Sequence, residues 1–104
     1  MEIYDSVKEF ERGNELKLLE RAGRISDLRR QVSLIISPEA KINDEIIKCI
    51  SYKADYMYIR NGKTVVEDVK PFDRKTQKYR LTKDFTIKWK LLKTRYKDYL
   101  FEIW

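Results

Sequence analysis

Two acidic residues and a lysine are grouped around a predicted β-hairpin between residues 53 and 70. Asn61-Gly62 is a strong two-residue turn signal, because a type I′ turn needs positive φ at both central positions. Counting back from this turn places Asp55 opposite Asp68, with Cβ atoms about 4.5–5.5 Å apart. Lys70 lies two residues beyond Asp68, so its side chain is expected on the same face.

Two carboxylates placed in this way repel each other, and a divalent cation between them would relieve the repulsion. Oxygen ligands favour a hard cation such as Mg²⁺ or Mn²⁺. By the same alternation Glu67 points to the other face, outside the site. In the alternative interpretation, Lys53 and Lys70 neutralise the two acids on a solvated face. The neighbouring valines argue for a strand pair covered on both faces, where unmatched carboxylates are costly; they are Val65, Val66 and Val69.

The rest of the composition limits the chemistry that the chain can perform. It contains no histidine and a single cysteine, Cys49. This excludes an internal disulfide, a zinc site of Cys and His ligands, and a nucleophile activated by histidine. The net charge of +6, from 23 Lys and Arg against 17 Asp and Glu, favours polyanionic partners such as DNA.

The length of 104 residues indicates one domain, residues 1–104. With 42% apolar and 38% charged residues, we expect a modest core beneath a strongly charged surface. The stretch MEIYDSVKEF lacks the pattern of a signal peptide, and no segment has the roughly 20 apolar residues that span a bilayer. We therefore expect no membrane partner and a cytoplasmic location in a bacterial or phage-infected cell.

Local signals predict an α/β fold, a mixed α+β domain with the order helix, three strands, helix, strand. Ser6 and Glu9 have the spacing of a capping box at a helix start, and Gly23 is suited to a helix end. Residues 71–80 are expected to form a polar connection. The expected helices are 7–22 and 83–95, and the expected strands are 28–36, 46–59, 64–70 and 99–104.

The segment from Asp55 through the hairpin to Asp68-Val69-Lys70 resembles the motif of the PD-(D/E)XK nuclease superfamily, with Ala54-Asp55 in place of Pro-Asp. The wider chain is similar to a family of small phage and prophage proteins assigned to this superfamily, over about nine tenths of its length. The other stretches that carry this resemblance are Ser6-x-x-Glu9, LKLLERAGRISDL with Gln31, YKADY, NGKTVVEDVK and LTKDFTIKWKLL.

The resemblance implies a restriction-endonuclease-like core of order αβββαβ, with a central mixed sheet flanked by helices. It also implies that Mg²⁺ or Mn²⁺ is bound by Asp55, Asp68 and the carbonyl of Val69. Lys70 would position or activate the attacking water. A glutamate from the first helix completes such sites, and the matching residue is Glu9.

Some of these assignments stay open at the level of the sequence. Glu9 is equally suited to the capping box, and Glu11 or Glu15 could take its place in the site. Gln31 is a lesser candidate for a position beside the metal ligands. The chain departs from the family pattern at Pro71, where glycine is usual, and at Gly13, but neither change removes a ligand.

The resemblance implies a metal-dependent endonuclease that hydrolyses phosphodiester bonds of DNA, structure-specific for branched or junction DNA as Holliday junction resolvases are, in phage DNA metabolism. The short chain favours a homodimer. The alternatives are a catalytically inactive nucleic-acid-binding module and a phage factor that binds a host protein. The residues expected to contact DNA are Gln31, Lys53, Arg74, Lys75, Lys78, Lys83, Lys88 and Lys90.

Overall fold

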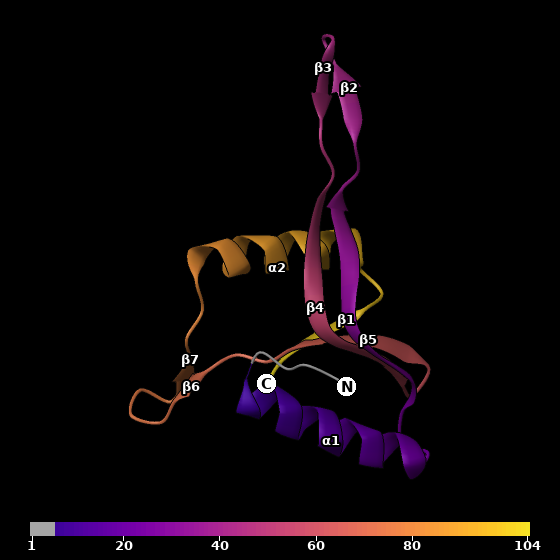
Figure 1. Ribbon diagram of the computed structural model, residues 1–104, viewed down its shortest axis with the longest axis vertical. Coiled ribbons are helices and arrows are strands. Elements are labelled where there is room, and N and C mark those ends of the chain that lie inside the picture. Colours follow the sequence, from indigo (N-terminus) through magenta and orange to yellow (C-terminus); the bar gives the residue numbers. More distant parts are fainter. Residues whose placement is uncertain (1–5) are drawn as a thin grey trace.

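The computed structural model describes residues 6–104 and is built around a four-stranded sheet of order β1-β4-β5-β8 (Figure 1). β4 pairs antiparallel with both β1 and β5, while β8 pairs parallel with β5. This confirms the predicted mixed α+β class and its mixed central sheet. The strands are β1 (Ser26–Ser37), β4 (Ile50–Arg60), β5 (Lys63–Asp68) and β8 (Leu100–Ile103).

The two helices, α1 (Val7–Arg21) and α2 (Lys83–Arg95), lie close to the predicted boundaries. The Ser6 hydroxyl accepts a hydrogen bond from the backbone N–H of Glu9 at 3.1 Å and so caps α1. α1 ends just before Gly23, whose φ of 75° is left-handed. Within residues 6–104, neither helix is long and apolar enough to cross a membrane.

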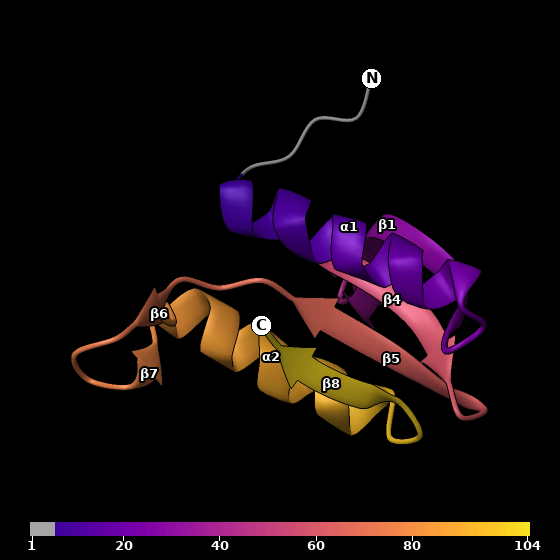
Figure 2. The same cartoon turned by 90° about the horizontal axis from the view of Figure 1, so that it is seen from below.

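The helices cover opposite faces of the sheet, and each face has its own core (Figure 2). We call these the α1 core and the α2 core. The α1 core consists of Leu16, Ile25, Tyr56, Tyr58 and Val65. The α2 core consists of Leu34, Ala54, Met57, Val66, Phe85, Trp89 and Leu92.

The side chains of β4 change faces at Asp55. Ala54 belongs to the α2 core and Tyr56 to the α1 core, although residues two apart on a regular strand share a face. The adjacent strand β1 changes in the same place, since Leu28 packs on the α1 core and Val32 on the α2 core. Between them Gln31 has a φ of 55°, which is uncommon for a residue with a side chain.

The connection between β1 and β4 differs from the prediction. We expected one turn at Ser37-Pro38 and one strand over 46–59, but the chain forms a hairpin arm of β2 (Ala40–Ile42) and β3 (Glu45–Ile47) that projects from the sheet (Figure 1). Its turn residues, Asn43 and Asp44, have φ of 50° and 63°. Both residue types tolerate this conformation, so the pair forms a turn without glycine.

The expected polar connection over 71–80 is mostly exposed, but it also contains a small hairpin that was not predicted. β6 (Phe72–Asp73) pairs antiparallel with β7 (Lys78–Tyr79). The Asp73 carboxylate accepts a hydrogen bond from the backbone N–H of Lys75 at 2.9 Å, which closes the turn. Strands of two residues lack the periodicity from which a strand is recognised.

Candidate functional site

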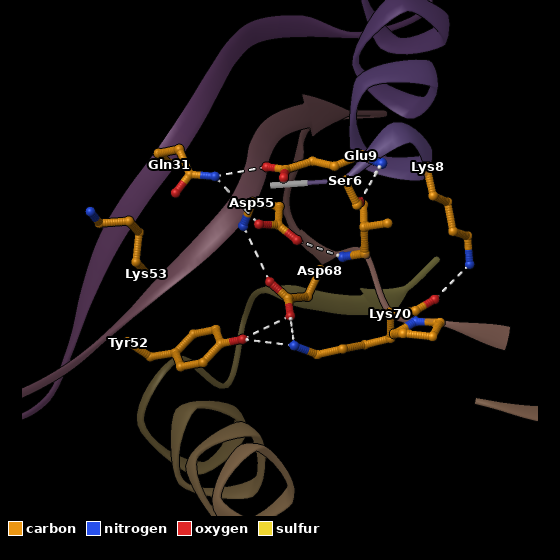
Figure 3. Close-up of a pocket in the computed structure, with 11 residues that line it drawn as sticks. Ser6, Lys8, Glu9, Gln31, Tyr52, Lys53, Asp55, Asp68 and Lys70 are labelled. Atoms are coloured by element: carbon orange, nitrogen blue, oxygen red, sulfur yellow. Dashed lines mark hydrogen bonds and ion pairs between the residues drawn. The ribbon is translucent and has the colours of Figure 1, made fainter. Parts of the chain in front are cut away.

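A cavity of about 610 Å³ opens between the first turn of α1, the first half of β4 and the end of β5 (Figure 3). All four predicted metal-binding residues line it, together with the predicted lysine and two of the predicted DNA contacts. These lining residues are Glu9, Asp55, Asp68, Val69, Lys70, Gln31 and Lys53. The structure thus brings together residues that are up to 61 positions apart in the sequence.

The two aspartates lie just past the paired part of the hairpin. β4 and β5 pair in the predicted register as far as Tyr56 and Glu67. Beyond that point the Asp68 carboxylate accepts a hydrogen bond from the backbone N–H of Asp55 at 3.2 Å. In return, the Asp55 carboxylate accepts one from the backbone N–H of Val69 at 2.8 Å. The two side chains therefore join the strands where the regular ladder has ended.

The Asp68 carboxylate is buried and has two further partners. Lys70 Nζ lies 2.8 Å from Asp68 Oδ2, on the face that the alternation predicted. The hydroxyl of Tyr52 donates to the same oxygen at 2.7 Å and lies 3.4 Å from Lys70 Nζ. Burial, and next the hydrogen bond to Asp68, raise the pKa of Tyr52, which keeps its hydroxyl a donor. Sequence reasoning missed Tyr52, since regular alternation places it on the face opposite to Asp55.

Glu9 enters the site from α1, with an exposed fraction of only 2%. Gln31 Nε2 donates to Glu9 Oε1 at 2.8 Å and lies 3.4 Å from Asp55 Oδ1. The backbone N–H of Glu9 donates to the Ser6 cap, while its side chain lines the cavity. Of the two alternatives, Glu11 is exposed and Glu15 pairs with Arg12 at 3.0 Å. Neither lines the cavity.

The neighbouring acidic side chains make ionisation of Asp55 less favourable. Burial, together with the nearby charges of Asp68 and Glu9, raises the pKa of Asp55 from 3.8 to about 7, although its hydrogen bond from Val69 acts in the opposite direction. Asp55 therefore binds a proton in a pH range where an exposed aspartate is ionised. A cation in the cavity would take the place of that proton.

The donor chemistry of the cavity fits a hard divalent ion. Carboxylates and a backbone carbonyl are the ligands that Mg²⁺ and Mn²⁺ prefer. Over residues 6–104, no three or more Asp, Glu, Cys or His side chains are already arranged to hold a metal ion. Two aspartate oxygens instead accept hydrogen bonds from backbone N–H groups. A metal ion at this place would share these carboxylates with their hydrogen-bond donors or displace those donors.

The remaining predicted DNA contacts fall into two groups away from the cavity. Arg74, Lys75 and Lys78 are exposed on the β6–β7 hairpin. Lys83 and Lys90 are exposed on α2, where Lys88 pairs with Asp84 at 3.3 Å. None of these residues lines the cavity, where the lysines are Lys8, Lys53 and Lys70.

The sequence also did not predict the contacts that Lys8 and Arg12 make. Lys8 lines the cavity and its Nζ donates to the backbone carbonyl of Lys70 at 2.7 Å. Glu67 points away from the site as predicted, but it is fully buried in a bidentate pair with Arg12, at 2.8 and 2.9 Å. The hydroxyl of Tyr58 donates to Glu67 as well, at 2.8 Å. This pair anchors α1, and with it Glu9, to β5.

A family model described as "Protein of unknown function (DUF1064)" matches residues 2–103. No curated protein and no solved structure matches the chain.

Proposed function

The chain belongs to the DUF1064 family, and we propose that it is a deoxyribonuclease that depends on Mg²⁺ or Mn²⁺. One observation carries the proposal: two aspartates, a buried glutamate and a lysine from three separate elements share one open cavity. Carboxylates of this kind are expensive to collect in a fold without a function. Their order along the chain also fits the nuclease motif that the sequence resembles.

In this proposal Asp55, Asp68, Glu9 and the carbonyl of Val69 hold the ion. The bound ion would polarise the scissile phosphate and favour deprotonation of the attacking water. Lys70 would position the attacking water or stabilise the phosphate, because its ammonium can donate to the water or to a phosphate oxygen that gains negative charge. Water adds to phosphorus as the bond to one sugar oxygen breaks; the attacking water gives up a proton and the departing sugar oxygen takes one up from solvent. No histidine is required for these steps.

The arrangement of the elements supports the finer assignment to a restriction-endonuclease-like core. α1 covers one face of the sheet and α2 the other, and β8 lies parallel to β5 beside the motif lysine. The lysines on α2 and the β6–β7 hairpin would follow the DNA backbone, which contributes affinity without sequence information. Such a small surface suits recognition of a DNA structure, such as a branch or junction, better than recognition of a sequence.

A cleavage assay tests this function directly. Purified protein is incubated with single-stranded, flapped, branched and duplex DNA in Mg²⁺ or Mn²⁺, with EDTA as the blank. We expect cleavage of at least one substrate, and its loss in Asp68→Ala and Lys70→Ala. Lys63→Ala, which removes an exposed lysine of the same hairpin, is the matched control and should cleave normally. Equal activity in all three variants would identify a contaminant and contradict the proposal.

A second function has its own supporting observation. Because Asp55 and Asp68 already bond to backbone N–H groups, the site is also suited to a purely structural role in a nucleic-acid-binding module. That function predicts DNA binding with the same affinity in Mg²⁺ and in EDTA, and no cleavage of any substrate. A nuclease function predicts instead that the divalent ion changes the DNA affinity and permits cleavage.

A further inference from the structure

A second cavity, of about 400 Å³, lies beside the candidate site and shares one wall with it. Lys8 lines both cavities. The other walls of the second cavity are Phe72, Arg74, Tyr79 and Trp104. We call it the aromatic cleft. Among residues 6–104, its walls combine three aromatic rings with two cations and contain no acidic residue.

The three rings come from two separate parts of the fold. Phe72 and Tyr79 are partners across the β6–β7 hairpin, with ring centres 5.0 Å apart in an edge-on contact. Trp104 follows β8, and its ring lies 3.7 Å from the guanidinium carbon of Arg12. Lys8, in the first turn of α1, has its Nζ 5.2 Å from the Tyr79 ring centre, and the hairpin lies on the same side of the molecule as the start of α1 (Figure 1).

The cleft is fixed to the motif by backbone contacts. The N–H of Trp104 donates to the carbonyl of Asp68 at 2.8 Å, and the N–H of Lys70 donates to the carbonyl of Trp104 at 2.7 Å. Lys8 Nζ adds its hydrogen bond to the Lys70 carbonyl (Figure 3). A ligand that extends past Lys8 would therefore pass from one cavity into the other.

The edge-on pair of Phe72 and Tyr79 also stabilises the small hairpin, as cross-strand aromatic pairs do. That role alone does not account for the exposure of the rings. Phe72, Tyr79 and Trp104 are 41%, 39% and 37% exposed. Exposed rings interleaved with cations are the features by which proteins bind single-stranded nucleic acid, because rings stack on bases while the cations attract phosphates.

We infer that the aromatic cleft binds an unpaired nucleotide next to the phosphate held in the candidate site. The inference rests on the proposed function, since it concerns the substrate of that site. Bases inside a duplex are stacked and paired, so their faces cannot reach the rings unless the strand opens. The substrate is then DNA in which the strand has an unpaired segment beside the scissile bond, and continuous duplex is excluded.

Binding measured in EDTA tests this inference without any cleavage. The probe is a fluorescent DNA hairpin with a short single-stranded extension, compared by anisotropy with the same hairpin without the extension. One stacked base should strengthen binding about fivefold or more. A third probe, whose extension consists of abasic residues, keeps the phosphates but removes the bases. It should bind at least about fivefold more weakly than the natural extension, because only the stacking contribution is lost.

Variants then locate the effect in the cleft. Tyr79→Leu and Phe72→Leu should each remove most of the preference for the extension, while Tyr79→Phe should retain it because the ring is kept. Tyr99→Leu is the matched control, since Tyr99 stacks on Tyr96 in the turn between α2 and β8, away from the cleft. This control should bind like the wild type.

Three results would overturn the inference. The first is equal binding of all probes by the wild-type protein, a result that does not depend on the folding of any variant. The second is an abasic extension that binds as tightly as the natural one, which would assign the preference to phosphates alone. The third is a preference that survives in Tyr79→Leu. The binding test and the cleavage test can also give different answers. If the Asp68→Ala variant keeps the preference for the extension but the wild-type protein cleaves no substrate, the proposed nuclease activity is wrong and the inference about binding still holds.

Discussion

The carboxylates of Asp55 and Asp68 each accept a hydrogen bond from the backbone near the other residue, with Val69 N–H 2.8 Å from Asp55 and Asp55 N–H 3.2 Å from Asp68. The two side chains thus continue the contact between β4 and β5 after the regular pairing stops. These carboxylates stabilise the contact between the strands, and they can also bind a proton. Replacing either one is therefore expected to change stability as well as activity, and the two effects have to be measured separately.

Asp55 should make the stability of the protein depend on pH. Its pKa is about 7 in the folded chain against 3.8 as the ordinary value, so the folded state binds the proton more tightly than the unfolded state. In EDTA, this contribution should lower the free energy of unfolding as the pH rises from about 4 to about 7, and then level off. Thermal unfolding across this range measures it.

Asp55→Asn should remove this decline, since an amide does not ionise. Asp44→Asn, in the exposed turn of the arm, is the matched control and should keep the wild-type profile. The same decline in both variants would show that other groups cause it.

Binding of a divalent ion should offset the loss of stability that ionisation of Asp55 causes. We expect Mn²⁺ or Mg²⁺ to raise the melting temperature more at pH 8 than at pH 5, because protons compete with the ion for the carboxylate. Titration calorimetry should detect binding that is lost in Asp68→Asn and weakened in Glu9→Gln. Glu11→Gln, an exposed position on the same helix, should bind as the wild type does. Equal heats in all variants would place the ion elsewhere.

Tyr52→Phe should weaken the site while leaving its charges in place. The variant removes the hydroxyl that donates to Asp68 at 2.7 Å, and a hydrogen bond to a charged group contributes about 1.5–3 kcal/mol. We expect the free energy of unfolding to fall by about that amount in urea denaturation. If the nuclease proposal is right, cleavage should fall as well, with little change in DNA affinity. A loss of affinity alone would assign Tyr52 to substrate binding.

Arg12→Ala should be among the most destabilising substitutions in α1. It leaves the fully buried carboxylate of Glu67 without its cation, which typically costs about 3–5 kcal/mol. Arg60→Ala breaks a half-exposed pair with Glu102 and should cost about 1 kcal/mol or less. Urea denaturation of both variants measures the difference. Similar costs at the two positions would mean that Glu67 is protonated or hydrated when Arg12 is absent.

The hairpin arm should be removable. Residues 38–50 are all exposed, and none of them belongs to either core. Replacing residues 38–49 by Asn-Gly connects Ser37 to Ile50, which are already partners in the sheet. We expect the free energy of unfolding to change by less than about 1 kcal/mol, since surface changes rarely exceed this. A large loss of stability would show that the arm is bound to something in solution, such as a second copy of the chain.

Features that depend on local chemistry were predictable from the sequence. The caps at Ser6 and Gly23 fix the ends of α1, and the Asn61-Gly62 turn fixes the register of β4 and β5. Alternation along β5 then places Lys70 beside Asp68 and Glu67 on the other face. Each of these inferences spans a few residues, or depends on one turn, so few competing arrangements had to be excluded.

Features that depend on the packing of distant segments were not predictable in this way. Regular alternation cannot anticipate the change of faces at Asp55, and without it Tyr52 is assigned to the wrong face. The partner of Glu67 is Arg12, 55 positions away, and no local pattern connects them. The arm and the β6–β7 hairpin were missed because strands of two or three residues show no periodicity.

The change of faces at Asp55 has a consequence for the evolution of the protein. Glu9 reaches the cavity from α1, whereas Tyr52 reaches it from the side of the α2 core, where its ring contacts Phe85. An amino-acid replacement in either the α1 core or the α2 core will therefore shift the same side-chain oxygens in the cavity. Neither half of the interior can drift independently of the other, and compensating changes should arise in pairs across the sheet.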